Sequence, residues 1–310
     1  MNVLIADHIH ELLITGLQQL GYRVSYQPHI TRDELIACIA DADGLVIRTK
    51  TTVDAEVLSH AGKLKFIARA GAGTDNIDES FCIRQNITLM NAGEANADAV
   101  GEQTVGMLLA LLANIVKADK EVRTMHWDRQ GNTGVELKGK TVGIIGYGNT
   151  GSAVATKLAG FGVNICVYDK YKQGFGTSTI QEVTLSELQR KSAIITLHVP
   201  LTAETRYMVN SSFIDAVSSP FYLLNLARGA VIHTKDVVAA LDSGKIIGAA
   251  LDVLENEKPE TFGPDELSWF DSLIRRNNVI LTPHIGGWTR ESYEKIAKVL
   301  LRKIKELPHS

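Results

Sequence analysis

The chain has 310 residues, a formal net charge of −3, and 45% apolar and 22% charged residues. This length allows two domains, and the composition is that of an ordinary globular protein. The small net charge, the lack of a long basic run and the lack of a membrane-length apolar stretch make nucleic acid and membranes poor candidate partners.

The first residues, Met1–Asp7, form a short apolar run that no basic region precedes, which favours a first β-strand over a signal peptide. The three cysteines, Cys38, Cys82 and Cys166, are far apart in apolar surroundings and show no metal-binding or disulfide-like spacing. We therefore expect buried thiols, no metal site and a cytoplasmic location.

Short apolar runs alternate with helical patterns over residues 1–93. The predicted strands are Val3–Ala6, Val24–Tyr26, Leu45–Ile47, Lys65–Ala68 and Thr88–Met90. The predicted helices are Glu11–Leu20, Thr31–Ile39, Val53–Ser59 and Asp78–Gln85, the second of which begins with a capping box. This alternation predicts a doubly wound parallel sheet with helices on both faces.

Two long helical patterns lie outside the simple alternation. Residues 98–122 are predicted as one apolar helix, either a buried crossover or part of a subunit interface. The charged amphipathic helix at 289–305 follows the last strand and is expected to pack back on the first domain. The predicted domains are therefore 1–95 plus 288–310, and 96–287, with a cleft between them that suits a cofactor and a small substrate.

A glycine-rich loop begins the second alternation. Gly146, Gly148 and Gly151 follow the predicted strand Thr141–Ile145 and precede the predicted helix Ser152–Leu158. In this pattern the first glycine allows a tight turn, the second lets the backbone approach a pyrophosphate, and the third lets helix and strand pack closely. The helix N-terminus then attracts the phosphates. The loop predicts a Rossmann dinucleotide-binding domain.

An acidic residue follows the next predicted strand, Asn164–Tyr168. Asp169 is placed about 20 residues after the loop, where a carboxylate accepts hydrogen bonds from the ribose hydroxyls. Because a carboxylate repels a 2′-phosphate, Asp169 favours NAD as the cofactor. Lys170 and Lys172 follow closely, and they leave NADP open as the alternative.

Three further groups follow predicted strands of the second domain. Arg228 comes after the strand Phe221–Leu224, Asp252 ends the run that starts at Gly248, and His284 follows the strand Val279–Leu281. Ligands bind at the carboxyl ends of such strands. A guanidinium there can bind a carboxylate in bidentate fashion, and a histidine backed by a carboxylate can exchange a proton near neutral pH. Taken singly, each group also fits an ion pair, a helix cap or a loop residue.

Together these residues resemble the D-isomer-specific 2-hydroxyacid dehydrogenase family over nearly the whole chain. The matching segments are Arg69–Asp78, Gly146–Gly151 with Asp169, Asn225–Gly229, Gly248–Glu257 and Pro283–Gly287. The resemblance implies a flavodoxin-like substrate-binding domain at 1–95 plus 288–310, a Rossmann NAD-binding domain at 96–287, and hydride transfer between NAD and a 2-hydroxy acid.

The resemblance also implies roles for individual residues. Arg228 would bind the substrate carboxylate and carbonyl, His284 would be the acid–base, and Glu257 its carboxylate partner, with Glu255 as the neighbouring candidate. Backbone amides of Gly71, Ala72 and Gly73 would face the substrate. The cofactor would be bound by the glycine loop and by Asn149, Thr150, Asp169, His198, Leu226, Ala227 and Asp252.

Within the family the pattern is most similar to the phosphoglycerate dehydrogenases. Arg48, Arg69 and Arg129 are located where those enzymes carry arginines for an anionic substrate, and a phosphate needs positive charge beyond Arg228. Trp288 and His233 depart from the usual pattern, which has small hydroxyl-bearing residues and an acid there. The sequence ends where longer members continue into a serine-sensing domain, so we do not expect feedback inhibition by that route.

The expected function is NAD-dependent oxidation of a phosphorylated 2-hydroxy acid by a homodimer. The first alternative is a reductase for hydroxypyruvate, glyoxylate or another 2-oxoacid, which would share the same core. The second is an NAD-sensing binding protein of the same fold. An activity assay separates the second alternative from the enzymes, and substitution of the arginines separates the two enzymes.

Overall fold

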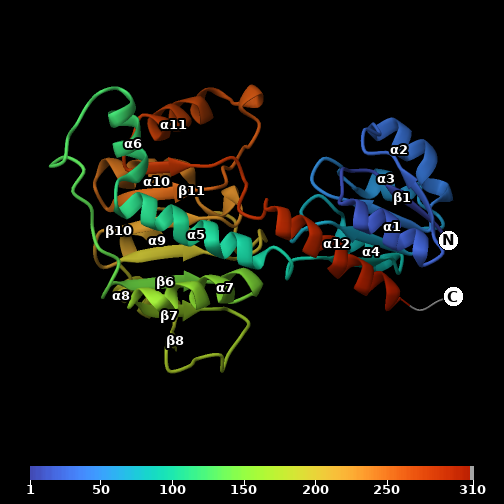
Figure 1. The fold of residues 1–310 in the computed structure, drawn as a ribbon, viewed down its shortest axis with the longest axis horizontal. Coiled ribbons are helices and arrows are strands. Elements are labelled where there is room, and N and C mark those ends of the chain that lie inside the picture. Colours follow the sequence, from blue (N-terminus) through green and yellow to red (C-terminus); the bar gives the residue numbers. More distant parts are fainter. Residues whose placement is uncertain (308–310) are drawn as a thin grey trace. The chain divides into compact units, whose positions relative to one another are not determined.

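The computed structural model describes residues 1–307, which divide into two compact units. The first unit contains residues 1–97 and the C-terminal segment from Gly287, and the second unit is Asp98–Gly286. The last three residues of the expected 288–310 segment lie outside the described residues. Figure 1 shows a sheet with flanking helices in each unit.

The first unit contains a five-stranded sheet in which all neighbouring strands are parallel. The strand order is β2-β1-β3-β4-β5, which is the flavodoxin-like order. The predicted flavodoxin-like sheet is therefore confirmed. Its strands are β1 (Asn2–Ile5), β2 (Arg23–Tyr26), β3 (Gly44–Ile47), β4 (Phe66–Arg69) and β5 (Thr88–Asn91).

Helices cover both faces of this sheet. They are α1 (Glu11–Gln19), α2 (Arg32–Cys38), α3 (Ala55–Ser59), α4 (Glu79–Arg84) and α12 (Arg290–Lys305). The predicted capping box is present, because the Thr31 side chain accepts from Glu34 N and the Glu34 carboxylate accepts from Thr31 N. α12 packs against α1, and the contact is close, since a Cβ on Gly16 would lie 2.4 Å from a methyl of Leu301. The C-terminal helix therefore belongs to the first unit.

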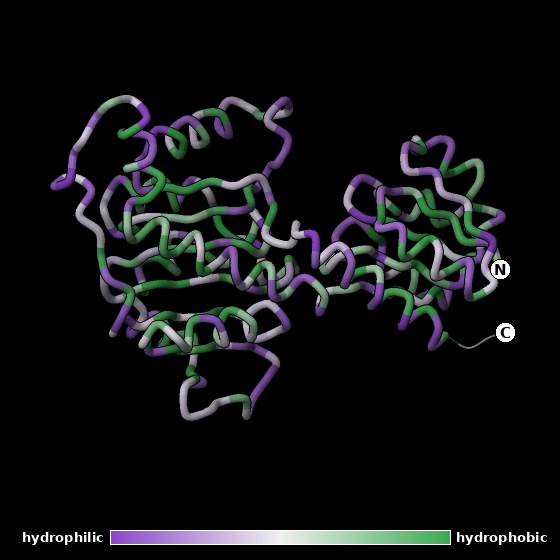
Figure 2. The backbone as a smooth tube through the Cα atoms, in the orientation of Figure 1, coloured by the Kyte–Doolittle hydropathy of each residue, from purple (hydrophilic) through white to green (hydrophobic). Residues whose placement is uncertain are grey.

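The second unit contains a seven-stranded sheet, also parallel throughout. The strand order is β12-β11-β10-β9-β6-β7-β8, which is the Rossmann order with one added strand. The strands are β6 (Thr141–Ile145), β7 (Asn164–Tyr168), β8 (Ile180–Glu182), β9 (Ile194–Leu197), β10 (Phe221–Asn225), β11 (Ile246–Leu251) and β12 (Val279–Leu281). Figure 2 shows these central strands as largely apolar, as expected for a sheet buried on both faces.

Two apolar cores lie on the two faces of the second sheet. One includes buried residues of α5 and α7, and the other includes residues of α8, α9, α10 and α11. These helices are α5 (Ala97–Leu112), α7 (Asn149–Leu158), α8 (Leu185–Lys191), α9 (Ser211–Ala216), α10 (Thr234–Asp242) and α11 (Pro264–Ile274). All three cysteines are free thiols, of which Cys82 and Cys166 are buried and Cys38 is half-buried.

The single helix predicted at residues 98–122 is wrong. The segment forms α5 and a second helix, α6 (Ile115–Arg123), with a bend of 63° between them. The break falls at Asn114, whose φ of 53° is left-handed, a conformation that asparagine tolerates and that ends a helix. Among the described residues no single helix is long and apolar enough to span a membrane, and only this bent pair reaches the length and composition.

Candidate functional site

The glycine loop after β6 has the shape that its sequence predicts. Gly146 has a φ of 95°, and a Cβ there would lie 2.4 Å from the carbonyl oxygen of His198. A Cβ on Gly151 would lie 1.9 Å from the carbonyl oxygen of Gly146, so no side chain fits there. A Cβ on Gly148, in contrast, would meet nothing within 4 Å. The surrounding backbone therefore excludes a side chain at Gly146 and Gly151, whereas the space beside Gly148 is open.

The N-terminus of α7 follows this opening. Gly148 is the N-cap, and the first bond from the helix runs from Ser152 N to Gly148 O at 3.1 Å. The amides of Asn149 and Thr150 therefore come before the first intrahelical bond. Free amides and the positive end of the helix dipole beside an open glycine fit a pyrophosphate.

Asp169 is hydrogen-bonded to three backbone amides at the end of β7. Its carboxylate accepts from Tyr147 N at 2.7 Å and from Tyr171 N and Lys172 N at 2.9 Å each. Burial raises the pKa of the Asp169 carboxyl, but these amides outweigh it and hold the pKa below its ordinary value. Asp169 is thus ionised near neutral pH. It also fixes the glycine loop through Tyr147.

The two lysines near Asp169 are engaged elsewhere. Lys170 pairs with Glu204 at 2.7 Å, and Lys172 Nζ donates to the carbonyl of Tyr147 at 2.9 Å. This geometry favours NAD, because Asp169 carries a fixed negative charge beside the glycine loop while both ammonium groups already have partners.

We expect Asp169→Asn to weaken the discrimination against NADP. Placing like charges together costs several kcal/mol, so loss of the charge should lower the NAD/NADP ratio of kcat/KM by about 10²-fold. Steady-state kinetics with both cofactors measure the ratio. Asp215→Asn, at an exposed position on α9, is the control. An unchanged ratio in Asp169→Asn would assign cofactor choice to other residues.

His198 is a buried neutral histidine behind the glycine loop. Its Nε2 is 2.9 Å from Thr196 Oγ1, and burial lowers its pKa to about 3. Nδ1 is buried and has no hydrogen-bond partner among the described residues. The carbonyl of His198 packs on Gly146, and the orphaned nitrogen of its ring fits a polar group of a bound dinucleotide.

Arg228 lies in a tightly held turn after β10. The side chain of fully buried Asn225 accepts from Ala227 N at 3.1 Å and donates to Arg228 O at 2.9 Å. Leu226 and Ala227 are buried within this turn. A Cβ on Gly229 would lie 1.8 Å from the carbonyl oxygen of Leu254, so the turn also packs against the segment after β11.

The segment after β11 decides between the two candidate glutamates. Glu255 accepts from Thr234 N at 2.7 Å, at the N-terminus of α10. Glu257 Oε2 lies 2.9 Å from His284 Nδ1. The structure therefore brings Glu257 together with His284, and Glu255 is occupied as a helix cap. With Nδ1 bonded to a carboxylate, Nε2 of His284 is left to accept a proton.

His284 occupies a strained backbone position that Asp252 maintains. Its φ is 55°, and its N–H donates to Asp252 O at 2.7 Å. The Asp252 carboxylate, 1% exposed, accepts from Ile285 N at 3.0 Å and from Gly286 N at 2.9 Å. Left-handed non-glycine residues cost about 1–3 kcal/mol and persist only where the surroundings impose them.

Two residues of this site were not predicted from the sequence. Gln103 Nε2 on α5 donates to Asp252 Oδ1 at 2.9 Å, and Thr282 Oγ1 donates to the same oxygen at 2.5 Å. The only signal for Gln103 is a polar residue inside an apolar helical pattern. Both residues donate to the Asp252 carboxylate, which in turn accepts from the backbone of the loop that carries His284.

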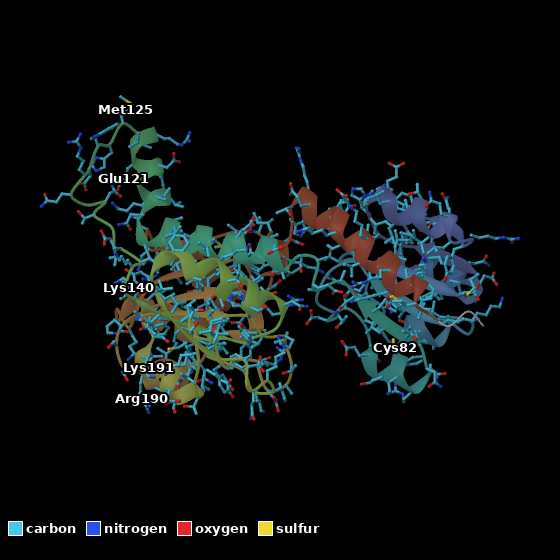
Figure 3. All side chains as sticks on the ribbon, turned by 60° about the horizontal axis from the view of Figure 1, so that its bottom comes forward. Cys82, Glu121, Met125, Lys140, Arg190 and Lys191 are labelled. Carbon is cyan, nitrogen blue, oxygen red and sulfur yellow. The ribbon has the colours of Figure 1, made fainter. Side chains whose placement is uncertain are left out.

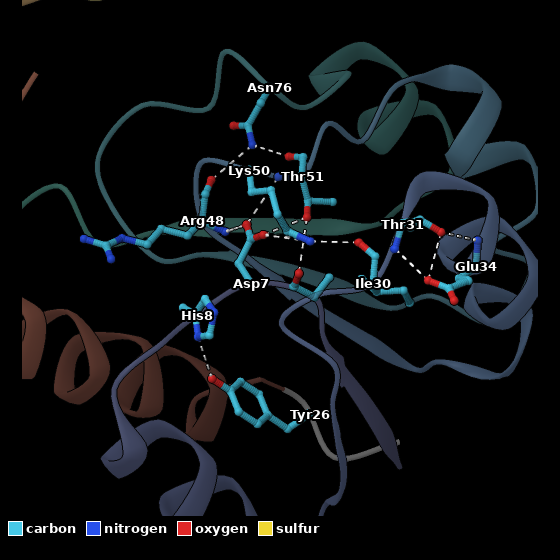
Figure 4. Close-up of polar contacts among 11 residues, drawn as sticks. Asp7, His8, Tyr26, Ile30, Thr31, Glu34, Arg48, Lys50, Thr51 and Asn76 are labelled. Carbon is cyan, nitrogen blue, oxygen red and sulfur yellow. Dashed lines mark hydrogen bonds and ion pairs between the residues drawn. The ribbon is translucent and has the colours of Figure 1, made fainter. Parts of the chain in front are cut away.

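Arg48 follows β3 in the first unit, in a network shown in Figure 4. Its N–H donates to the buried carboxylate of Asp7, which also accepts from Thr51 Oγ1 at 2.8 Å. Asn76 Nδ2 donates to the carbonyls of Arg48 at 3.1 Å and Thr51 at 2.6 Å. The backbone of Arg48 is thus fixed. Burial lowers the pKa of its guanidinium, which nevertheless stays charged near neutral pH.

Arg69 is the last residue of the neighbouring strand, β4, and the turn Gly71–Gly73 follows it. Gly71 has a φ of 153°, and a Cβ there would lie 1.5 Å from Arg69 Nη1, so the guanidinium packs directly on this glycine. Ala72 accepts from Asn91 Nδ2 at 2.7 Å. β1, β3 and β4 are neighbours, so Asp7, Arg48 and this turn share the carboxyl edge of the first sheet.

Arg129 is not brought to the carboxyl edge of the second sheet. It is exposed in the segment between α6 and β6, which is anchored at the end of α5 by Val135 N donating to Leu112 O at 2.9 Å. Leu111 lies near Gly248, in the amino-terminal half of β11. Figure 3 shows Met125, in the same segment, well beyond the end of α5. Arg228 and His284 lie at the other edge.

Residues 105–286 match the family model described as "D-isomer specific 2-hydroxyacid dehydrogenase, NAD binding domain". This match covers more than half of the chain. The chain belongs to the D-isomer-specific 2-hydroxyacid dehydrogenase family. The open glycine loop, Asp169 and the orphaned His198 nitrogen thus lie within its NAD-binding domain.

Members of this family with several different names resemble the chain. It is 36% identical to D-3-phosphoglycerate dehydrogenase from Methanocaldococcus jannaschii, over 99% of this chain and 57% of that protein. It is 37% identical to hydroxypyruvate reductase from Thermotoga maritima, over 90% of this chain and 89% of that protein. D-lactate dehydrogenase from Aquifex aeolicus, solved with NAD and lactic acid, superposes with a TM-score of 0.85 at 28% identity, covering 98% and 94% of the two chains.

The chain spans little more than half the length of the phosphoglycerate dehydrogenase that it matches and nearly all of the hydroxypyruvate reductase. The two relatives are similarly identical to it. Membership of the 2-hydroxyacid dehydrogenase family therefore follows from the match, whereas the choice of substrate depends on the residues of the individual chain.

Proposed function

We propose that the protein oxidises D-3-phosphoglycerate to 3-phosphohydroxypyruvate with NAD, the first step of serine biosynthesis. The observation that carries this proposal is the His284–Glu257 pair at the same sheet edge as Arg228 and the glycine loop. The relative named D-3-phosphoglycerate dehydrogenase supports the choice of substrate. NAD, when bound, supplies the hydride acceptor.

In this proposal His284 accepts the proton of the C2 hydroxyl through Nε2. Glu257 keeps the ring in the required tautomer and stabilises the imidazolium that forms. Arg228 binds the substrate carboxylate and polarises the adjacent carbon–oxygen bond, and the amides of Gly71–Gly73 contribute further donors. The strained loop keeps His284 in one orientation before the substrate arrives.

The phosphate requires positive charge beyond Arg228. Arg48 and Arg69 lie at one edge of the first sheet, and we assign both to the phosphate. A guanidinium binds a phosphate through two parallel N–H donors, which neither a lysine nor a neutral residue reproduces.

We expect Arg48→Ala and Arg69→Ala to raise KM for 3-phosphoglycerate at least tenfold. A hydrogen bond to a charged group contributes about 1.5–3 kcal/mol, and each variant removes such bonds to the phosphate. KM for an unphosphorylated 2-hydroxy acid should change about threefold or less. Arg84→Ala on α4, another arginine of the first unit, is the control. Equal losses on both substrates would favour the reductase described next.

The main alternative is reduction of hydroxypyruvate, glyoxylate or another 2-oxoacid. It is favoured by the equally similar hydroxypyruvate reductase, which the chain covers almost completely. A substrate panel read at 340 nm, in both directions with NAD and NADP, separates the two activities. Absence of turnover on every acid of the panel, with NADH still bound, would favour the NAD-sensing protein of the same fold.

We also propose that the protein is a cytoplasmic homodimer. Exposed apolar side chains on α6 and in the segment after it support association of two copies: Ile115, Val116, Val122, Met125 and Trp127. The unpaired cysteines support a reducing compartment. Light scattering measures the oligomeric state, and a monomeric mass at micromolar concentration would contradict the dimer.

A further inference from the structure

The guanidinium of Arg48 is close to two aromatic rings. Its Cζ is 4.0 Å from the centroid of the Trp288 ring and 4.9 Å from that of Tyr293. All three residues belong to the first unit. Arginine stacks well on aromatic faces because its planar cation is weakly hydrated and attracted to the π-system.

A cation–π contact uses the charge of the guanidinium and does not use its N–H donors. Among residues 1–307, none accepts a hydrogen bond from this guanidinium. The nearby carboxylate of Asp7 is instead occupied by Thr51 and by the backbone of Arg48. A planar cation that contacts two aromatic rings, and whose N–H donors no described residue accepts from, fits a bidentate oxyanion.

The backbone on both sides of Trp288 is fixed by contacts within the first unit. A Cβ on the preceding Gly287 would lie 2.5 Å from Asn96 Nδ2, so the backbone packs against Asn96 there. The following Thr289 is the N-cap of α12 and accepts from Ser292 N at 3.0 Å. The Trp288 side chain is nevertheless 58% exposed, so core packing does not account for a large aromatic residue at this position.

Trp288 is the nearer of the two rings that contact Arg48. With a small residue at position 288, only Tyr293 of this pair would remain beside the guanidinium.

We propose that Trp288 is a specificity-determining residue that orders Arg48 for the phosphate of the substrate, an assignment that rests on the proposed function. An arginine that is already immobile loses less side-chain freedom when it binds an anion. On this basis Trp288 should lower KM for the phosphorylated substrate about three- to tenfold. It should leave kcat nearly unchanged, because Arg48 binds ground state and transition state alike.

Trp288→Thr, which removes the ring, tests this role against Trp288→Phe, which keeps an aromatic ring. We expect KM for 3-phosphoglycerate to rise about three- to tenfold in the threonine variant and twofold or less in the phenylalanine variant. In an Arg48→Ala background the threonine substitution should add no further loss. Such non-additivity is the signature of two residues that act as one unit.

A second readout does not depend on turnover. The Arg48 Nε–H signal in ¹⁵N NMR should report a rigid side chain in the wild-type protein and a mobile one in Trp288→Thr. A side chain that stays rigid, or an equal KM loss with and without Arg48, would overturn the role of Trp288. If 3-phosphoglycerate is not turned over at all, the proposed function fails. In that case the ¹⁵N measurement, which needs no substrate, still decides whether Trp288 orders Arg48.

Discussion

His284→Asn should lower kcat by about 10²–10⁴-fold, the usual contribution of general acid–base catalysis. Asparagine tolerates the left-handed backbone that His284 adopts, so the loop should keep its conformation while the proton acceptor is lost. Single-turnover hydride transfer, followed at 340 nm, measures the effect on the chemical step.

Two controls separate this loss from damage to the fold. The affinity for NADH, measured by fluorescence, should stay within about twofold, because the glycine loop and Asp169 belong to other segments of the same unit. His60→Asn removes an exposed histidine at the end of α3 and should leave kcat unchanged. Wild-type turnover in His284→Asn would contradict its assignment as the acid–base.

Asp252→Asn should damage both stability and activity. The buried carboxylate accepts hydrogen bonds from Gln103, Thr282 and two backbone amides, whereas an asparagine would place an NH₂ group against some of these donors. A buried donor without a partner costs about 1–3 kcal/mol. We therefore expect a loss of about 3 kcal/mol in the free energy of unfolding and a fall of about 10²-fold in kcat.

Denaturant unfolding and steady-state kinetics on the same preparation measure the two effects. Asp271→Asn on α11 removes an exposed carboxylate that pairs with Arg275, and such a surface change is worth less than about 0.5–1 kcal/mol. Normal stability and normal turnover in Asp252→Asn would show that the His284 loop is held by its other contacts. A loss confined to NADH affinity would assign Asp252 to the cofactor alone.

Periodicity predicted the strands of the first sheet and most strands of the second because each pattern is local, but it did not predict the short edge strand β8. The alternation of buried strands with helices predicted parallel sheets. The pair Thr31 and Glu34 predicted a helix start that the structure contains. The prediction of one helix at residues 98–122 was wrong because composition does not show that Asn114 adopts a left-handed conformation. That conformation is stabilised by contacts outside the helix, including the bond from Asn114 Nδ2 to Thr133 O at 3.1 Å.

The sequence by itself determined the family pattern: the glycine loop, Asp169, and the positions of Arg228 and His284 after their strands. These features depend on residue type and spacing within short segments. Only the tertiary structure showed that Glu257 pairs with His284 while Glu255 caps a helix. It alone also showed that Gln103 donates to Asp252 and that the Trp288 ring contacts Arg48. Each of these contacts joins residues far apart in the chain, and spacing along a sequence does not show which distant side chains meet when the strands align.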